Sequence, residues 1–257
     1  MGRDLIIHDD CLSALERIAT DQPGSVHMIL ADLPYGTTQN KWDSPIDLAR
    51  LWALLDKVCV PNAVMAFTAS QPFTSALVMS NPKRFRHEWV WIKNRGSNFA
   101  NTVREPMKEH ESVLIFSRGK WTYNKQMQER TGGGVSRVEY GFEKSAPERT
   151  ENFGEFEYKR PEALGTLRVP SSWQKFNTEV GLHPTQKPVG LFAYLIRTYT
   201  NEGDLVLDPC AGSGTTAMAA IETRRRYICI EREQKYVDVM RQRLDLFSMM
   251  SGLEPVQ

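Results

Sequence analysis

The 257-residue sequence contains no long hydrophobic run. No stretch approaches the ~20 consecutive apolar residues that a membrane-spanning helix requires. The first residues lead directly into a strand-like run, so we expect no signal peptide. An N-myristoylation signal is excluded because position 6 is Ile rather than Ser or Thr. These absences argue against membrane-bound and secreted proteins and lead us to expect a cytoplasmic one.

Cysteine is also scarce, and the four cysteines show no CxxC spacing. Common zinc sites and dithiol redox motifs depend on such spacing, and disulfide frameworks are typical of short secreted chains. We therefore expect Cys11, Cys59, Cys210 and Cys229 to be free thiols, mostly buried, and we expect no metal site. The sequence has no internal repeat.

The net charge of +1 neither favours nor excludes a nucleic-acid partner. The distribution of charge is more informative, because residues 83–108 contain seven Lys or Arg against only Glu88 and Glu105. Such a local excess can follow a phosphate backbone. An ordinary solvated surface explains it equally well, and both interpretations stay open.

Hydrophobic residues make up 41% of the chain, enough for a sizeable core in one large domain or two small ones. Short apolar runs alternate with amphipathic stretches, which is typical of βαβ units and a parallel sheet. Strands are expected at 4–8, 26–31, 63–68, 88–92, 112–116, 205–207 and 227–230, with 112–116 a candidate antiparallel strand. Helices are expected at 12–18, 48–58, 73–79, 189–199 and 216–223, and near the C-terminus.

The segment 119–182 has a different composition. It contains Gly132-Gly133-Gly134, many charges, few aliphatic residues and scattered aromatic residues, and it lacks a long periodic stretch. Such a segment is poor material for a central sheet and is typical of a mobile insertion or a small recognition region. We therefore predict a catalytic domain formed by 1–118 and 183–257, interrupted by an insertion at 119–182.

A glycine turn follows the expected strand 205–207. It reads Asp208-Pro209-Cys210-Ala211-Gly212-Ser213-Gly214-Thr215, and it leads from a strand into a helix, as a nucleotide site requires. Glu231 ends the next strand, where a carboxylate can accept hydrogen bonds from ribose hydroxyls. A dinucleotide site and a purely structural turn are the alternatives.

Asp208 argues against a dinucleotide, because a carboxylate there would repel a pyrophosphate. It suits the cationic amino group and sulfonium of S-adenosylmethionine, which the glycines would let approach the backbone closely. A Pro-Cys dipeptide also carries the nucleophile of cytosine C5-methyltransferases. Cys210 lies inside the glycine motif, however, where its thiol would form part of the pocket wall.

A second motif, Asp32-Leu33-Pro34-Tyr35, directly follows the expected strand 26–31. An exocyclic base amine is a poor nucleophile, so its methylation requires acceptors that position it against a methyl donor. Asp32 and the Leu33 carbonyl can accept its two N–H groups, Tyr35 can stack on the base, and Pro34 fixes the turn. An ordinary strand-end turn is the alternative.

Together these residues resemble the S-adenosylmethionine-dependent DNA amino-methyltransferases, whose catalytic signature is [D/N/S]-P-P-[Y/F/W]. Leu33 departs from it, although the role there is a main-chain carbonyl. The catalytic motif precedes the glycine motif, as in the β-class of that family. The resemblance covers roughly residues 4–118 and 183–247 and implies a doubly wound α/β fold with a mixed, mostly parallel sheet, the Rossmann-like methyltransferase fold. The inserted segment corresponds to the target-recognition region.

The resemblance also assigns further residues to S-adenosylmethionine. Asp10 would contact the adenine of the cofactor, although capping of the following helix is an equal alternative. Thr185 and Lys187 lie in His183-Pro184-Thr185-Gln186-Lys187-Pro188, which looks like the family's further cofactor-binding element. A surface-loop lysine is the alternative for Lys187.

The implied activity is methylation of adenine N6 in double-stranded DNA, by direct transfer after base flipping. Aspartate at position 32 favours adenine N6 over cytosine N4, which stays an alternative. Methylation of RNA or of a protein glutamine, and a DNA-binding module without turnover, are the others. The family raises a homodimer as an option, but the sequence shows no dimer face. The recognition sequence and any association with a restriction nuclease are left open.

Overall fold

The computed structural model describes residues 5–36, 45–130, 166–179 and 186–251. Contacts divide the chain into two compact units, the first made of Met1–Asn124 with Ser172–Gln257 and the second of Lys125–Ser171. Among the residues described in the second unit, β6 (Gln128–Glu129) pairs antiparallel with β7 (Leu167–Arg168). The sequence predicted domain boundaries at 118/119 and 182/183, whereas the two units meet after Asn124 and after Ser171. The recognition role of the insertion stays a prediction.

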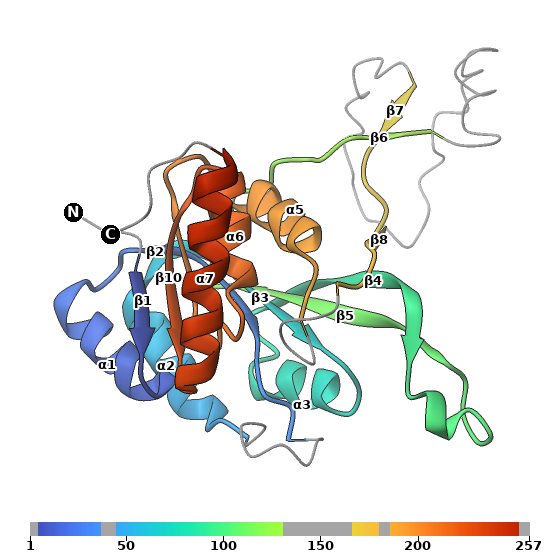
Figure 1. Cartoon of the computed structure of the whole chain (residues 1–257), viewed down its shortest axis with the longest axis horizontal. Coiled ribbons are helices and arrows are strands. Elements are labelled where there is room, and N and C mark those ends of the chain that lie inside the picture. The colour runs from blue at the N-terminus through green and yellow to red at the C-terminus, as the bar shows by residue number, and fades with distance from the viewer. Residues whose placement is uncertain (1–4, 37–44, 131–165, 180–185, 252–257) are drawn as a thin grey trace, which may run out of the picture. The chain divides into compact units, whose positions relative to one another are not determined.

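The first unit contains an eight-stranded sheet in the order β1-β10-β9-β2-β3-β5-β4-β8 among the described residues (Figure 1). Strands β1, β10, β9, β2 and β3 pair in parallel, and β5 is antiparallel to both β3 and β4. The strands are β1 (Leu5–His8), β2 (Val26–Asp32), β3 (Cys59–Ala69), β4 (Phe85–Ser97), β5 (Lys108–Ser117), β8 (Trp173–Lys175), β9 (Leu205–Asp208) and β10 (Arg226–Glu231).

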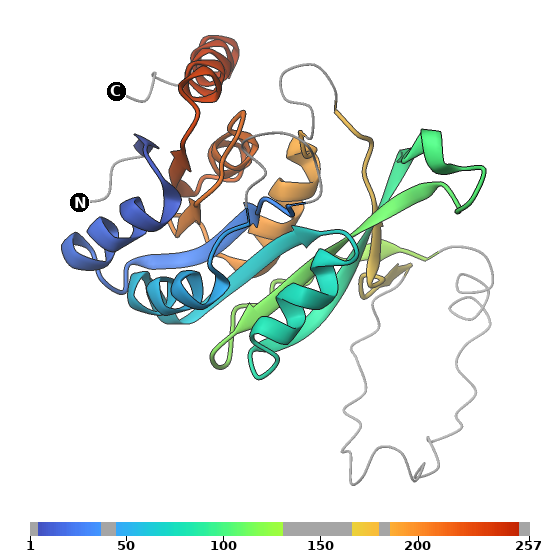
Figure 2. The ribbon, with the colours of Figure 1, turned by 90° about the horizontal axis from the view of Figure 1, so that it is seen from below.

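Helices cover both faces of this sheet (Figures 1 and 2). One face carries α1 (Cys11–Asp21), α2 (Leu48–Val58) and α3 (Phe73–Ser80), and the other carries α5 (Val189–Tyr199), α6 (Thr215–Glu222) and α7 (Gln234–Ser251). A short 3₁₀ turn, η1 (Phe99–Asn101), lies between β4 and β5. Within the described residues, no helix is long and apolar enough to cross a membrane.

Side-chain alternation along the strands builds two cores. In β2, Ile29 and Ala31 face the α1–α3 layer, whereas Met28 and Leu30 face the α5–α7 layer. The strand is buried on both faces because parallel strands in doubly wound folds have helices above and below. The predicted fold class, a doubly wound mixed and mostly parallel sheet, is confirmed.

Candidate active site

Two carboxylates end neighbouring parallel strands at one edge of the sheet. Asp32 is the last residue of β2 and Asp208 the last of β9, and the two strands pair at Met28↔Val206 and Ile29↔Leu207. Neighbouring strands lie about 4.8 Å apart, so the two motifs meet although most of the chain separates them. This is also the point where the strand order reverses, at which doubly wound folds bind ligands.

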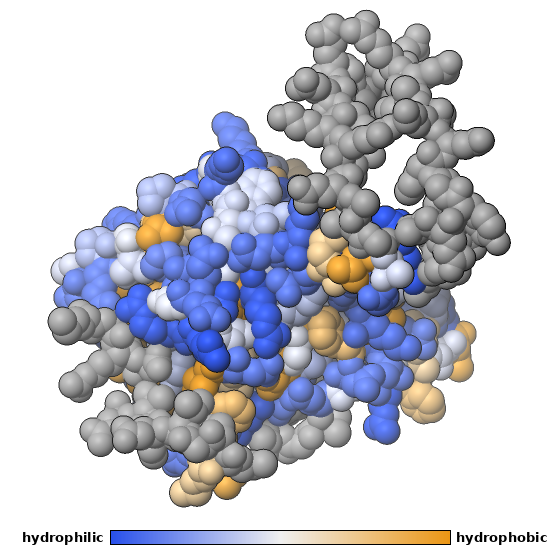
Figure 3. Space-filling view, turned by 90° about the horizontal axis from the view of Figure 1, so that it is seen from above, coloured by the Kyte–Doolittle hydropathy of each residue, from blue (hydrophilic) through white to orange (hydrophobic). Residues whose placement is uncertain are grey.

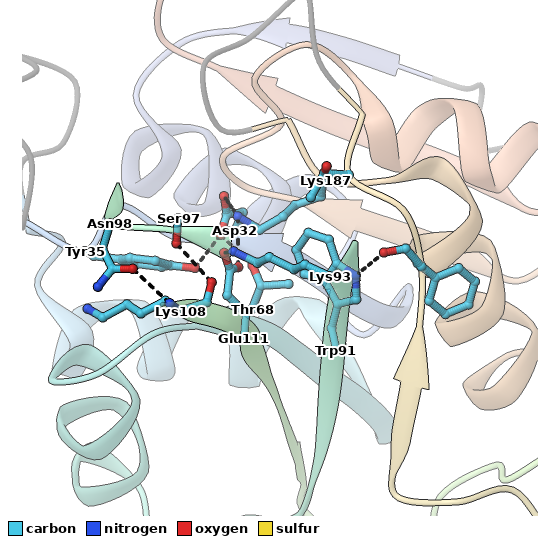
Figure 4. A network of polar contacts seen from close by, with 12 residues as sticks. Asp32, Tyr35, Thr68, Trp91, Lys93, Ser97, Asn98, Lys108, Glu111 and Lys187 are labelled. Atoms are coloured by element: carbon cyan, nitrogen blue, oxygen red, sulfur yellow. Dashed lines mark hydrogen bonds and ion pairs between the residues drawn. The ribbon is translucent and has the colours of Figure 1, made fainter. Parts of the chain in front are cut away.

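The Asp32 carboxylate accepts hydrogen bonds from three side chains (Figure 4). The Tyr35 hydroxyl donates to Oδ1 at 2.7 Å, and the hydroxyl of Thr68, on the adjacent β3, donates to the same oxygen. The Lys187 ammonium donates to Oδ2 at 2.7 Å. A carboxylate offers about four acceptor positions, so one is left for a further donor.

The Tyr35 ring packs against Phe73 while its hydroxyl is bonded to Asp32. Its ring stacks on Phe73 with centroids 5.1 Å apart and 23° between the planes. Burial and the charges of Asp32 and Glu111 raise the pKa of the Tyr35 hydroxyl well above its usual value. Tyr35 therefore stays protonated and acts as a donor.

Lys187 links Asp32 to a second buried ion pair (Figure 4). Its ammonium lies 3.4 Å from Oε2 of Glu111, and Oε1 of Glu111 binds the ammonium of Lys93. Burial alone would lower the pKa of Lys187, but the charges of Asp32 and Glu111 outweigh it and raise that pKa. The site therefore holds two ammonium groups against two carboxylates. Sequence reasoning placed Lys187 with the cofactor; its ammonium lies at Asp32.

The Asp32–Tyr35 turn is held to the hydrophobic core by the side chain of Leu33. The Leu33 side chain is 2% exposed and packs in the core beneath α1–α3. Leucine therefore replaces the proline of the family signature with a hydrophobic anchor, which explains how the turn tolerates the departure. Pro34 follows it and is partly buried.

The glycine motif forms a tight turn between β9 and α6. Gly212 and Gly214 adopt positive φ angles of 51° and 83°, which side chains rarely tolerate. A Cβ atom on Gly214 would lie 2.3 Å from Cγ of the buried Met240. The turn is closed by a hydrogen bond of 2.8 Å from the Gly214 N–H to the Ala211 carbonyl.

Asp208 is turned into this loop and is only 2% exposed. Its carboxylate accepts the Cys210 N–H at 2.9 Å and the Thr216 hydroxyl. Burial raises the pKa of Asp208 to about 7, against the effect of those two hydrogen bonds. Asp208 thus organises the glycine loop; direct contact with a cofactor stays a prediction.

Glu231 ends β10 and braces the same loop. One of its carboxylate oxygens accepts the Gly212 N–H at 2.8 Å and the other the Glu233 N–H at 2.8 Å. Asp10 caps α1, because its side chain accepts the N–H groups of Leu12 and Ser13 at 3.1 Å each. The helix-capping alternative for Asp10 is therefore realised, and the cofactor roles of both acids stay predictions.

The other predicted residues line or support the loop. Ser213 is held by Arg243, which donates to its carbonyl at 2.7 Å, and the Thr215 hydroxyl donates to the Lys187 carbonyl at 3.2 Å. A hydrogen bond to Cys11 raises the pKa of the Cys210 thiol well above its usual value, as does burial. All four cysteines are free, as predicted. Thr185 lies outside the described residues.

Sequence reasoning missed four residues that complete the site. Thr68, Lys93 and Glu111 surround Asp32 and Lys187, and Thr216 holds Asp208. Thr68 could have been found, because it ends the expected strand 63–68, the next strand after the catalytic motif. Lys93 and Glu111 gave no signal, since they lie within ordinary strands that pairing alone brings together.

This geometry defines a class of protein, an α/β enzyme with an acidic turn beside a glycine loop. Comparison with known families agrees: a family model described as DNA methylase, the N6/N4 methyltransferase family, matches residues 26–242. The chain belongs to this family, and the predicted resemblance is confirmed.

One curated relative is similar to most of the chain, and another is similar to a third of it. The DNA adenine methyltransferase YhdJ of Escherichia coli is 28% identical over 264 residues, covering 97% of this chain and 85% of that protein. The type II methyltransferase M2.MboI of Moraxella bovis is 40% identical over 85 residues, covering 33% of this chain and 30% of that protein.

Solved structures show the same fold. The crystal structure of the M1.HpyAVI–SAM complex matches with a TM-score of 0.63 and 25% identity, covering 93% of this chain and 99% of that chain. The cytosine-N4-specific PvuII DNA methyltransferase matches with a TM-score of 0.64, covering 93% of this chain and 86% of that chain. At 14% identity, the second match shows the fold alone.

Proposed function

We propose that the chain is an S-adenosylmethionine-dependent DNA methyltransferase that methylates adenine N6 in double-stranded DNA. The observation that carries the proposal is the Asp32 carboxylate at the end of β2, held by three donors beside the glycine loop of β9. Membership of the N6/N4 methylase family and the likeness to YhdJ, a DNA adenine methyltransferase, support it.

The residues around the glycine loop suit S-adenosylmethionine. Asp208 and Glu231 are acidic, and residues 208–216 include no Lys or Arg that would attract a pyrophosphate. Gly212, with a positive φ of 51°, has no Cβ atom, so a ligand can approach its backbone closely. When bound there, the cofactor supplies the methyl group. Asp10, Cys210 and Ala211 are the proposed further wall residues.

The catalytic turn would position the target amine. Asp32 accepts one N–H at its remaining acceptor position, and the Leu33 carbonyl accepts the other. Tyr35 offers its ring to the base while its hydroxyl stays on Asp32. Lys187 balances the charge of Asp32, so the carboxylate acts only as an acceptor. A stacked base cannot reach this turn, so the target adenine must be extruded from the duplex.

Methyl transfer from labelled S-adenosylmethionine to unmethylated duplex DNA tests the proposal, with mass spectrometry of the digested nucleosides. We expect N6-methyladenine with the native chain and none with Asp32→Ala. N4-methylcytosine instead would keep the chemistry and change the base. If no methylated nucleoside forms although the cofactor binds, the proposal is wrong, and RNA and protein acceptors are the next substrates to assay.

A further inference from the structure

The end of the hairpin between β4 and β5 carries three exposed large hydrophobic side chains. Phe99 is 80% exposed, Val103 is 87% exposed and Met107 is 38% exposed. The hairpin projects from the sheet at the right of Figure 1, and hydrophobic surface lies beside strongly hydrophilic surface at the same edge of Figure 3. Isolated exposed apolar residues are common, but three in one projecting hairpin call for an explanation.

The tip is held in a fixed conformation by Asn98, which has a left-handed φ of 62°. The Asn98 amide donates to Oε1 of Glu105 at 2.9 Å and to the Pro106 carbonyl at 3.2 Å. The Asn98 side-chain carbonyl accepts the Lys108 N–H at 2.8 Å. These bonds close the loop, and the apolar side chains are exposed on this hydrogen-bonded turn.

Three basic residues flank Phe99 and Val103 along the hairpin. Arg95, Arg104 and Lys108 are exposed, and none forms an ion pair within the part of the chain that the structure describes. The tip also carries two acids: Glu105, which is engaged by Asn98, and Glu109, which lies beside Gly96. A duplex fits, because it offers phosphates to the cations and stacked bases to the apolar residues.

The same hairpin reaches the catalytic site. Its strands carry Lys93 and Glu111, which bind each other beside Lys187 and Asp32. Phe99 follows Lys93 by six residues, so at about 3.3 Å per residue it lies within roughly 20 Å along the strand. A duplex whose base enters the Asp32 turn therefore lies within reach of the tip.

We infer that the tip of the β4–β5 hairpin is a wedge that inserts Phe99 between base pairs beside the extruded adenine. Val103 contacts the neighbouring sugar or base edge, and Arg95, Arg104 and Lys108 bind phosphates on either side. Inserted side chains of this kind replace the stacking that a base loses when it leaves the helix. The inference rests on the proposed function and adds to it the element that opens the duplex.

Two measurements on the full chain test this wedge. The first compares methyl transfer to native and to heat-denatured unmethylated DNA, because only the duplex has to be opened. The second measures unwinding of a closed circular plasmid relaxed by topoisomerase in the presence of the protein, which needs no methyl transfer. The variants are Phe99→Ala and Phe99→Trp. Leu246→Ala is the matched control, since Leu246 is also exposed, at 61%, but lies on α7.

Phe99→Ala should lower kcat/KM on native DNA about tenfold to a hundredfold, as the free energy of one base–aromatic stack predicts. Its activity on denatured DNA should stay within about twofold of the native chain, because an unpaired base enters the Asp32 turn without any opening of a helix. Phe99→Ala should also abolish plasmid unwinding, whereas Phe99→Trp and Leu246→Ala should retain both properties.

The outcomes separate this inference from the proposed function. Unwinding that depends on Phe99, without any DNA methylation, would keep the wedge and overturn the proposed function. Methylation of duplex DNA that is equal for Phe99→Ala and Leu246→Ala would overturn the wedge alone. If the native chain neither unwinds the plasmid nor binds duplex DNA, or if Phe99→Ala changes only its sedimentation as an oligomer, the wedge is wrong.

Discussion

The Lys187 ammonium balances the charge of the Asp32 turn. Asp32 lies partly buried, where desolvation disfavours a lone carboxylate. The ammonium 2.7 Å away compensates that charge, and the Tyr35 and Thr68 hydroxyls solvate it further. The result is a charged acceptor in a partly dry site, with its geometry fixed before a substrate arrives.

Replacing Asp32 with Ala should abolish methyl transfer, with a loss of kcat of at least about 10²-fold to 10⁴-fold. Most of the proposed cofactor residues lie at the end of β9, in the loop that follows it, at the end of β10 and just before α1, so affinity for S-adenosylmethionine should change less than about threefold. Single-turnover transfer and equilibrium binding of the cofactor measure the two effects separately. Near-normal turnover would contradict the assigned role of Asp32.

Glu111 should contribute to the free energy of unfolding because it is the counter-ion of the buried Lys93. The Lys93 side chain is only 7% exposed and depends on Glu111, so Glu111→Gln leaves a buried ammonium without its counter-ion. Removing one partner of such a pair costs about 3–5 kcal/mol of unfolding free energy. Chemical denaturation should show this loss for Glu111→Gln and a smaller one for the double variant with Lys93→Met.

The control for that experiment is Glu222→Gln. Glu222 pairs with Arg197, and both side chains are more than 40% exposed, at 44% and 42%. An exposed pair contributes about 0–1 kcal/mol. Equal effects of Glu111→Gln and Glu222→Gln on unfolding would mean that the buried pair does not act as described.

Gly214, in the loop between β9 and α6, and Gly203, just before β9, form a matched pair of glycines. Gly214 and Gly203 both have a φ of 83°, so alanine strains the backbone at either position by about 1–2 kcal/mol. Only at Gly214 does the added Cβ meet the buried Met240; at Gly203 nothing lies within 4 Å. Gly214→Ala should therefore lower stability further and weaken binding of S-adenosylmethionine about tenfold, whereas Gly203→Ala should leave binding unchanged.

Met240→Ala provides the complementary test of that contact. It removes the side chain that the new Cβ would meet, so the double variant with Gly214→Ala should recover part of the lost cofactor affinity in calorimetric titration. If Gly203→Ala weakened cofactor binding as much as Gly214→Ala, backbone strain rather than the Met240 contact would explain both.

Asp208 should make stability depend on pH. Burial raises its pKa from 3.8 to about 7, so between these values the folded chain holds a proton that the unfolded chain has released. Its contribution to the free energy of unfolding therefore falls as pH rises from about 4 to 7, by an amount on the order of 4 kcal/mol.

Comparison with Asp208→Asn isolates this effect, because the other titratable groups are common to both proteins. The free energy of unfolding of the native chain, relative to that of the variant, should decline between pH 4 and 7. A relative free energy that stays constant over this range would show that Asp208 titrates normally in the folded chain.

Helices and buried strands were predictable from sequence, and irregular pairings were not. The predicted 48–58 and 189–199 coincide with α2 and α5, since each has a clear apolar face. β4 extends to Phe85–Ser97, well beyond the predicted 88–92, because its C-terminal end is polar and lies in a projecting hairpin. β8 was missed, as three residues of Trp173–Lys175 carry no pattern, and its pairing with β4 depends on tertiary contact.

The acidic residues of the site that end strands could be predicted from the sequence. Asp32, Asp208 and Glu231 each follow a buried apolar run, and such positions meet at one edge of a parallel sheet. Lys93 and Glu111 became visible only through the pairing of β4 with β5. The position of Glu111 also explains why the Lys187 ammonium lies beside Asp32. Comparison of motifs had assigned Lys187 to the cofactor.

At the scale of the whole molecule, the basic residues of 83–108 fall into two groups, those bound to other residues of the protein and those exposed to solvent. Arg84 is bound to Asp56, Arg86 donates to the Ser117 carbonyl, and Lys93 is paired with Glu111. These three are bound within the protein. Of the exposed ones, Arg95, Arg104 and Lys108 belong to the β4–β5 hairpin.

The salt dependence of DNA binding should therefore depend strongly on the tip. Each phosphate contact contributes about 0.9 to the slope of log K against log salt, so replacing Arg95, Arg104 and Lys108 by Ala should reduce the slope by about 2.7. Fluorescence anisotropy of a labelled duplex at several KCl concentrations measures it. The control removes the same charge elsewhere, at the exposed Lys57, Lys235 and Arg241. Equal slopes for the two triple variants would mean that the basic residues of the tip do not bind phosphates and belong to an ordinary solvated surface.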